Sequence, residues 1–143
     1  MRFLCDITVL FAASDAAHYH HHRSLEVVAR ASRETAFVAA HSLAELYATL
    51  SAIAAPKLRR VAHVLEAVEH AATVFTAVTL SAADYLWVVR HVASVDGRSG
   101  QIYDALILKC ADVAGVDVVY TWNTVHFRRI AWPMVAERIR SPG

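Results

Sequence analysis

Three carboxylates lie inside the most apolar segments of this chain of 143 residues. An ionised carboxylate is costly to bury unless a cation or hydrogen-bond donors meet it. A solvated face accommodates one such residue, but three of them, far apart in sequence, predict a shared pocket that needs negative charge. They are Asp6 in the segment 3–11, Glu45 in the segment 43–47 and Asp104 in the segment 102–108.

The composition predicts a compact folded protein with a partly apolar surface, because hydrophobic residues make up 57% of the chain and charged residues only 19%. Such a surface favours a permanent partner, either a second copy or another chain. The formal net charge of +1 neither requires nor excludes nucleic-acid binding, because a local basic strip is enough for it.

No apolar segment approaches the length of a membrane span, which is about 20 residues. The N-terminal apolar segment is similar to a signal peptide, but Asp6 divides it, so we expect a cytoplasmic protein that does not contact the membrane. Cys5 and Cys110 lie in apolar segments, which favours buried thiols. A single disulfide between them stays open.

Short apolar segments typical of strands alternate with segments of helical periodicity. We expect strands at 2–5, 35–39, 73–75, 116–120 and 133–135. We expect helices at 9–13, from the loop 14–22 to about 33, from Ser42 to Pro56, and at 58–71, 81–93 and 101–114. Ser42 and Glu45 match a capping box, and Gly115 matches a helix C-cap. The alternation predicts an α/β fold with a single domain over residues 1–143, in which helices cover both faces of a central, mostly parallel sheet of four or five short strands.

Polar side chains follow two of these strands at the point where each strand ends. Asp6 follows the first strand, and Thr121 and Asn123 follow the strand at 116–120. In parallel sheets, ligands bind beyond the carboxyl ends of the strands. Because the helices that carry Glu45 and Asp104 can lean over the same edge, we expect all five side chains to meet there.

The same residues resemble the motifs of a known family. Residues 6–10, Asp6-Ile7-Thr8-Val9-Leu10, resemble the opening motif of PIN-domain nucleases. The segment HSLAELYATL around Glu45 resembles the second acidic motif, and residues 97–130 resemble the third motif and the segment after it. The order and spacing over nearly the whole chain resemble the VapC toxins of bacterial toxin–antitoxin pairs.

The resemblance implies a PIN-like three-layer α/β/α fold and a metal-dependent ribonuclease, usually dimeric, that cuts RNA and is inhibited by a cognate antitoxin. By the same resemblance, Asp6, Glu45 and Asp104 hold one or two Mg²⁺ or Mn²⁺ ions, directly or through water. Asn123 stands where the family often has a fourth acid. The site therefore has one negative charge fewer, which puts tight binding of a second metal ion in doubt.

Hydrolysis of a phosphodiester needs a nucleophilic water and neutralisation of the charge that develops on oxygen, and hard divalent cations with oxygen ligands supply both. Thr121 and Asn123 are then candidates to hydrogen-bond the attacking water or a substrate phosphate. Thr8, Arg98 and His126 are candidates to contact the substrate. We expect direct attack by water, with no covalent enzyme intermediate.

Each residue taken alone has a simpler interpretation. Asp6 and Glu45 fit helix caps, Asp104 fits a helix N-terminus where negative charge is favoured, and Thr121 and Asn123 fit a turn. Two alternatives to the ribonuclease therefore stay open: a catalytically weakened PIN-like module that binds RNA or protein, and a nuclease specific for DNA structures.

A dense group of histidines lies in the loop that follows the first helix. Imidazole suits zinc or nickel, but no cysteine or acidic pattern completes such a site, so we expect a solvent-exposed loop, and metal binding there stays open. The four residues are His18, His20, His21 and His22.

Overall fold

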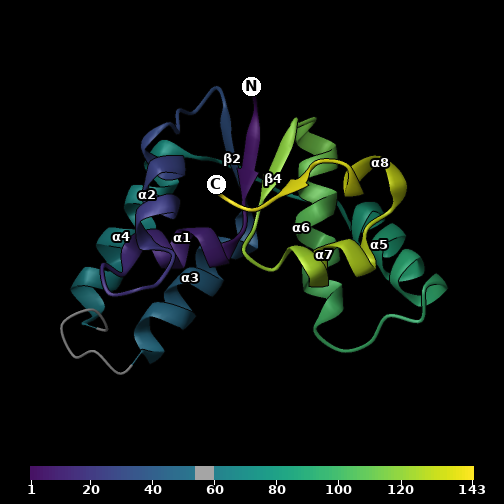
Figure 1. Cartoon of the computed structure of the whole chain (residues 1–143). Coiled ribbons are helices and arrows are strands. Elements are labelled where there is room, and N and C mark those ends of the chain that lie inside the picture. The colour runs from purple at the N-terminus through teal and green to yellow at the C-terminus, as the bar shows by residue number, and fades with distance from the viewer. Residues whose placement is uncertain (54–59) are drawn as a thin grey trace.

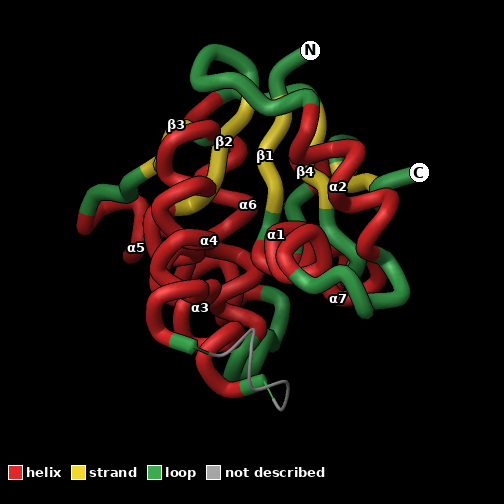
Figure 2. The backbone as a smooth tube through the Cα atoms, turned by 90° about the vertical axis from the view of Figure 1, so that its left-hand side faces the viewer, coloured by secondary structure: helices red, strands yellow, loops and turns green. Residues whose placement is uncertain are grey.

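A parallel sheet forms the centre of the protein in a computed structural model that describes residues 1–53 and 60–143. Within these residues, five strands pair side by side in the order β3-β2-β1-β4-β5, and every pairing is parallel. The strands are short, as Figures 1 and 2 show. They are β1 (Phe3–Cys5), β2 (Ala36–Ala39), β3 (Thr76–Val78), β4 (Val118–Tyr120) and β5 (Ile139–Arg140).

Helices cover both faces of this sheet (Figure 1). On one face lie α1 (Ile7–Ser14), α2 (His21–Ala29), α3 (Ala40–Ala52) and α4 (Val61–Val74). On the other face lie α5 (Ala82–Ser94), α6 (Gln101–Ala114), α7 (Thr124–Ile130) and α8 (Pro133–Ala136). This arrangement confirms the predicted three-layer α/β/α fold with a parallel central sheet.

The central strands are apolar throughout because both of their faces are buried. In β1, Phe3 and Cys5 pack into the core with α1–α4, while Leu4 between them packs into the core with α5–α8. Cys110 packs on that second side, so the two cysteines lie in different cores, and both are free and buried. The predicted buried thiols are therefore confirmed.

Two helix ends follow directly from the local sequence. The Ser81 hydroxyl accepts a hydrogen bond from the Asp84 amide, and the Asp84 carboxylate accepts one from the Ser81 amide, so a complete capping box starts α5. At the end of α6, Gly115 adopts φ 64°, the left-handed conformation that glycine adopts at low cost. Both predicted boundaries are confirmed.

The predicted capping box at Ser42 is wrong. The chain passes from β2 directly into α3, whose cap is Ala39, so Ser42 lies inside the helix. Its hydroxyl is buried and has no hydrogen-bond partner within the described chain. The predicted helix end at Pro56 and the predicted start of the next helix at residue 58 lie outside the described residues.

The predicted strand at 133–135 is also wrong. Pro133 occupies the first turn of a helix, where its missing amide hydrogen costs nothing, and these residues form α8. The last strand comes a few residues later, at Ile139–Arg140, beside β4. The strand predicted at 73–75 is displaced in the same direction, because α4 continues to Val74 and β3 begins at Thr76. Over the described part of the chain, no helix has the length and hydropathy needed to cross a bilayer.

The loop between α5 and α6 offers a matched pair of glycines for a test of packing. A Cβ atom on Gly97 would lie 2.6 Å from Val92 Cγ1 and 2.8 Å from Ile130 Cδ1, whereas a Cβ atom on Gly100 would meet no atom of the described residues within 4 Å. Because Val92 and Ile130 are buried, Gly97→Ala should lower the free energy of unfolding by about 1–3 kcal/mol. Gly100→Ala should change it by less than about 0.5 kcal/mol. Urea denaturation of both variants measures the difference, and equal stabilities would contradict the packing described for this loop.

Candidate active site at the carboxyl edge of the sheet

Asp6 lies at the carboxyl end of β1 and caps α1. Its Oδ1 accepts hydrogen bonds from the Thr8 amide, at 2.8 Å, and from the Thr8 hydroxyl. Its Oδ2 accepts a hydrogen bond from the Thr121 hydroxyl at 2.9 Å. Thr121 follows β4, so residues 115 positions apart meet where two neighbouring parallel strands end. This is the edge at which the sequence predicted them to meet.

The Asp6 carboxyl group is 1% exposed, and burial raises its pKa from 3.8 to about 6. The hydrogen bonds from Thr8 and Thr121 act in the opposite direction, because they stabilise the carboxylate. Burial nevertheless dominates, and no positive charge among the described residues opposes it. A bound cation is the kind of partner that removes such a cost.

The loop after β4 is tied to the start of α1 by further hydrogen bonds. The Trp122 amide donates to the Thr8 hydroxyl oxygen at 2.9 Å, and the Asn123 amide donates to the Thr121 hydroxyl oxygen at 3.0 Å. Each threonine hydroxyl thus donates to Asp6 and accepts from a backbone amide. The Asn123 side chain lies exposed beside this network.

Glu45 and Asp104 lie on the two helices that lean over the same edge. Because α3 begins directly after β2, Glu45 lies in the second turn beyond the carboxyl end of that strand. Asp104 lies in the first turn of α6, which then leads back to β4. Burial raises the pKa of Asp104; the positive charge of His126 opposes this rise, and the negative charge of Glu45 adds to it. These three side chains therefore interact electrostatically.

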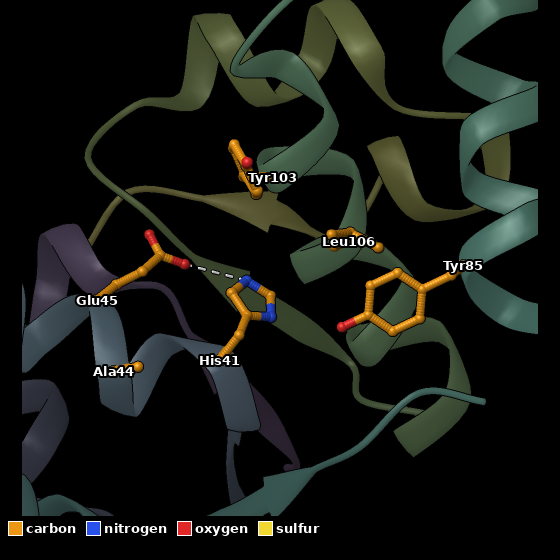
Figure 3. A pocket seen from close by; sticks show the side chains of 6 residues that line it. All are labelled: His41, Ala44, Glu45, Tyr85, Tyr103 and Leu106. Carbon is orange, nitrogen blue, oxygen red and sulfur yellow. Dashed lines mark ion pairs between the residues drawn. The ribbon is translucent and has the colours of Figure 1, made fainter. Parts of the chain in front are cut away.

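The Glu45 side chain is turned toward His41, one helical turn earlier on α3 (Figure 3). Glu45 Oε1 and His41 Nε2 lie 3.1 Å apart, but neither atom makes a well-directed hydrogen bond within the described chain, although both are buried. A buried carboxylate oxygen without a donor is a candidate metal ligand. The sequence prediction did not include His41, although a histidine four residues before an acid on one helix face was visible in the sequence.

Together, Asp6, Glu45 and Asp104 have the donor chemistry of a site for a hard divalent cation. All three offer carboxylate oxygens, and Mg²⁺ and Mn²⁺ prefer oxygen ligands. As they stand, no three His, Cys, Asp or Glu side chains within residues 1–53 and 60–143 are close enough together to hold an ion. The three residues therefore fit such an ion in their donor chemistry, while the Glu45 side chain is paired with His41.

The predicted substrate contacts lie in three different places. Thr8 is part of the Asp6 network, and His126 on α7 is exposed and acts on Asp104. Arg98 lies on the loop before α6, where its Nη2 is 3.1 Å from Asp96 Oδ1 and both side chains are largely exposed. Thr8 and His126 are thus linked to the acidic side chains, whereas Arg98 pairs with a neighbouring surface acid.

A cavity of about 400 Å³ opens between α3, α5 and α6 beside Glu45. Figure 3 shows that the side chains of His41, Tyr85 and Tyr103 face it from these three helices. Neither tyrosine was predicted to be functional, because each follows the periodicity of its own helix and only the tertiary fold brings both to Glu45.

The histidine loop, which the sequence predicted to be solvent-exposed, is exposed only in part. His18, His20 and His21 are all partly buried, and only His22 is exposed. The His20 ring stacks on the Trp122 ring with their centres 3.6 Å apart, and His21 Nδ1 lies 2.9 Å from the Ala12 carbonyl oxygen. Apolar and stacking contacts therefore outweigh the polarity of these residues.

Three solved structures share this fold at 17% sequence identity each. The VapC20 toxin of Mycobacterium tuberculosis, described as cleaving the sarcin–ricin loop, has a TM-score of 0.68 over 85% of this chain and 89% of its own. VapBC2 of Rickettsia felis, bound to a DNA fragment from its promoter, has a TM-score of 0.64 over 99% of this chain and 98% of its own. PAE2754 of Pyrobaculum aerophilum has a TM-score of 0.61 over 97% of this chain and 83% of its own.

Comparison of the sequence with family models identifies one family. No curated protein matches the chain. The family model of the PIN domain, by contrast, matches residues 3–133, a range that includes every residue of the proposed acidic site. The chain therefore belongs to the PIN domain family.

Proposed function

We propose that this protein is a metal-dependent endoribonuclease that acts as a toxin of the VapC type. The observation that carries the proposal is the buried Asp6 carboxylate with its raised pKa, placed by a PIN fold at the sheet edge over which Glu45 and Asp104 also lean. The likeness to a toxin described as cleaving the sarcin–ricin loop supports RNA as the substrate. We place the activity in the cytoplasm, where such a substrate is found.

In this proposal, Asp6, Glu45 and Asp104 hold one or two Mg²⁺ or Mn²⁺ ions. When bound, a divalent cation supplies an acidified water molecule and neutralises charge on the phosphate oxygens. Thr8 and Thr121 fix the orientation of the Asp6 carboxylate through their hydroxyl groups. Asn123, exposed beside this network, offers an amide to a substrate phosphate or to the attacking water. His126, whose imidazole acts on Asp104, offers a ring nitrogen to the RNA backbone.

A cognate antitoxin and a second copy of the chain are the protein partners that we propose. The match to VapBC2 over nearly the full length of both chains supports the first. Exposed apolar side chains on α5, among them Leu86, Trp87 and Val89, support the need for a protein partner, because monomers seldom expose such a row.

A catalytically weakened PIN module that only binds RNA or protein is the second candidate. It is favoured by the pairing of Glu45 with His41 and by Asn123 at the position of a fourth acid. Because such a module has no reason to retain a metal site, metal binding separates the two candidates.

Neutralising either of two acids should strongly slow the cleavage of RNA. With Mg²⁺ or Mn²⁺ present, Asp6→Asn and Asp104→Asn should each lower the rate on purified cellular RNA by on the order of 100-fold or more, because a preorganised charge is lost. Asp117→Asn is the matched control: Asp117 is exposed and precedes β4, at the opposite edge of the sheet. Gel analysis of cleavage measures the rates. Equal rates for all four proteins would remove the catalytic assignment, and parallel assays on DNA test the preference for RNA.

Without metal, Asp6→Asn should remove a pH-dependent loss of stability. Folding raises the pKa of Asp6 from 3.8 to about 6, so the folded state binds the carboxyl proton more tightly than the unfolded state does. The free energy of unfolding therefore falls as the pH rises through this interval. The shift corresponds to about 3 kcal/mol between pH about 4 and pH about 7. Urea denaturation in the presence of a chelator should show this fall for the wild type and a much smaller one for Asp6→Asn. Parallel pH profiles for the two proteins would contradict the burial described for Asp6.

Titration calorimetry with Mn²⁺ should show binding to the wild type with release of protons. Asp6 is partly protonated near pH 6 and must ionise to bind a cation, so the measured heat should depend on the ionisation enthalpy of the buffer. Asp104→Asn should weaken binding, whereas Asp117→Asn should not. A wild-type protein that binds no Mn²⁺ would favour the binding module instead.

A further inference from the structure

A second hollow lies beside Asp6, on the side of α1 and of the loop after β4. It measures about 280 Å³. Its lining is mainly aromatic: four of the six residues carry rings, and the other two belong to the network around Asp6. The residues are Thr8, Phe11, His18, His20, Trp122 and Asn123.

The rings of this hollow hold one another in place. The His20 ring stacks on Trp122 at 3.6 Å with an angle of 8° between the planes, and the His18 ring meets the Phe11 ring edge to face at 5.6 Å. Trp122 is fixed in turn by a hydrogen bond of 2.8 Å from its Nε1 to the buried Ser24 hydroxyl. The four rings are therefore positioned before any ligand binds, which lowers the entropic cost of stacking on them.

Hydrogen bonds connect the hollow to the proposed reaction centre. The Thr8 hydroxyl donates to Asp6 and accepts from the Trp122 amide, so Thr8 is shared by the carboxylate and the hollow. Trp122 itself lies between Thr121, which donates to Asp6, and Asn123. A group bound in the hollow thus lies next to the residues that we propose to act on a phosphate.

We propose that this hollow is a subsite for an unpaired nucleobase of the RNA, next to the bond that is cut. Its chemistry suits a base better than a phosphate, because aromatic rings line it and no Lys or Arg of the described residues does. Stacking on aromatic side chains is how proteins hold single-stranded bases with little regard to sequence. This inference rests on the proposed function, because it takes RNA as the ligand. It gives the histidine loop a role in binding that RNA.

Tyr19 extends the same surface toward solvent. Its side chain is 94% exposed, yet its ring lies 4.9 Å from the His20 ring. An exposed aromatic ring beside a row of packed rings gives a neighbouring base a further surface to stack on.

The test compares two RNA probes that differ only in their bases. Fluorescence anisotropy measures the affinity for labelled oligoadenylate and for the same chain with abasic sites, with a chelator present so that nothing is cut. The wild type should bind the abasic chain on the order of tenfold more weakly. Phe11→Leu and His18→Leu keep apolar bulk but remove a ring, so each should remove most of this difference. Tyr47→Leu, which changes a partly exposed aromatic residue of α3 outside the hollow, should retain it.

Each result supports or overturns the inference. Equal affinity of the wild type for both probes, no binding of either probe, or a full difference in Phe11→Leu and His18→Leu would overturn it. Thermal unfolding of each variant shows whether it is folded, and Tyr19→Leu, at an exposed position, repeats the comparison if both ring variants fail to fold. Cleavage with Mn²⁺ is scored separately: discrimination without cleavage would count against the nuclease alone, and cleavage without discrimination would count against the subsite alone.

Discussion

The contact between Asp6 and two threonine hydroxyls is the interaction on which the rest of the site depends. Thr8 and Thr121 hold the two oxygens of one buried carboxylate, and so they fix the end of β1 against the end of β4. Hydrogen bonds of this kind stabilise the ionised form, yet burial still raises the pKa of Asp6 to about 6. The protein therefore retains a costly charge at the sheet edge, which is typical of a site built for a ligand rather than for stability.

The sheet topology explains why this charge lies where it does. From β1 the chain crosses to β2 on one side and later returns to β4 on the other, so the two connections diverge at β1. Side chains at the carboxyl ends of β1 and β4 border the crevice that this divergence creates. Asp6 and Thr121 occupy it, and the ring-lined hollow around Trp122 opens beside it. The proposed metal site and the proposed base subsite thus lie at one feature of the fold.

Sequence patterns predicted those parts of the fold that depend on local periodicity or on burial of both strand faces. The strand at 116–120, the helix ended by Gly115 and the meeting of Asp6 with Thr121 are examples. The patterns failed where the rest of the fold, or a second local preference, opposed the local rule. Ser42 has the side chain of a helix cap, but β2 leads into α3 without a loop, so the helix begins before Ser42. The apolar residues after Pro133 are too few for their periodicity to distinguish a strand from a helix. The stacking of His20 on Trp122 joins residues about one hundred positions apart, so no local sequence pattern predicts it.

The pairing of Glu45 with His41 is the contact that the proposed metal site would replace. The most direct measurement is therefore a crystal structure with Mn²⁺, in which anomalous scattering locates the ion. We predict Mn²⁺ bound among the carboxylates of Asp6, Glu45 and Asp104, with Glu45 turned away from His41. Manganese elsewhere on the protein, with Glu45 still beside His41, would contradict it.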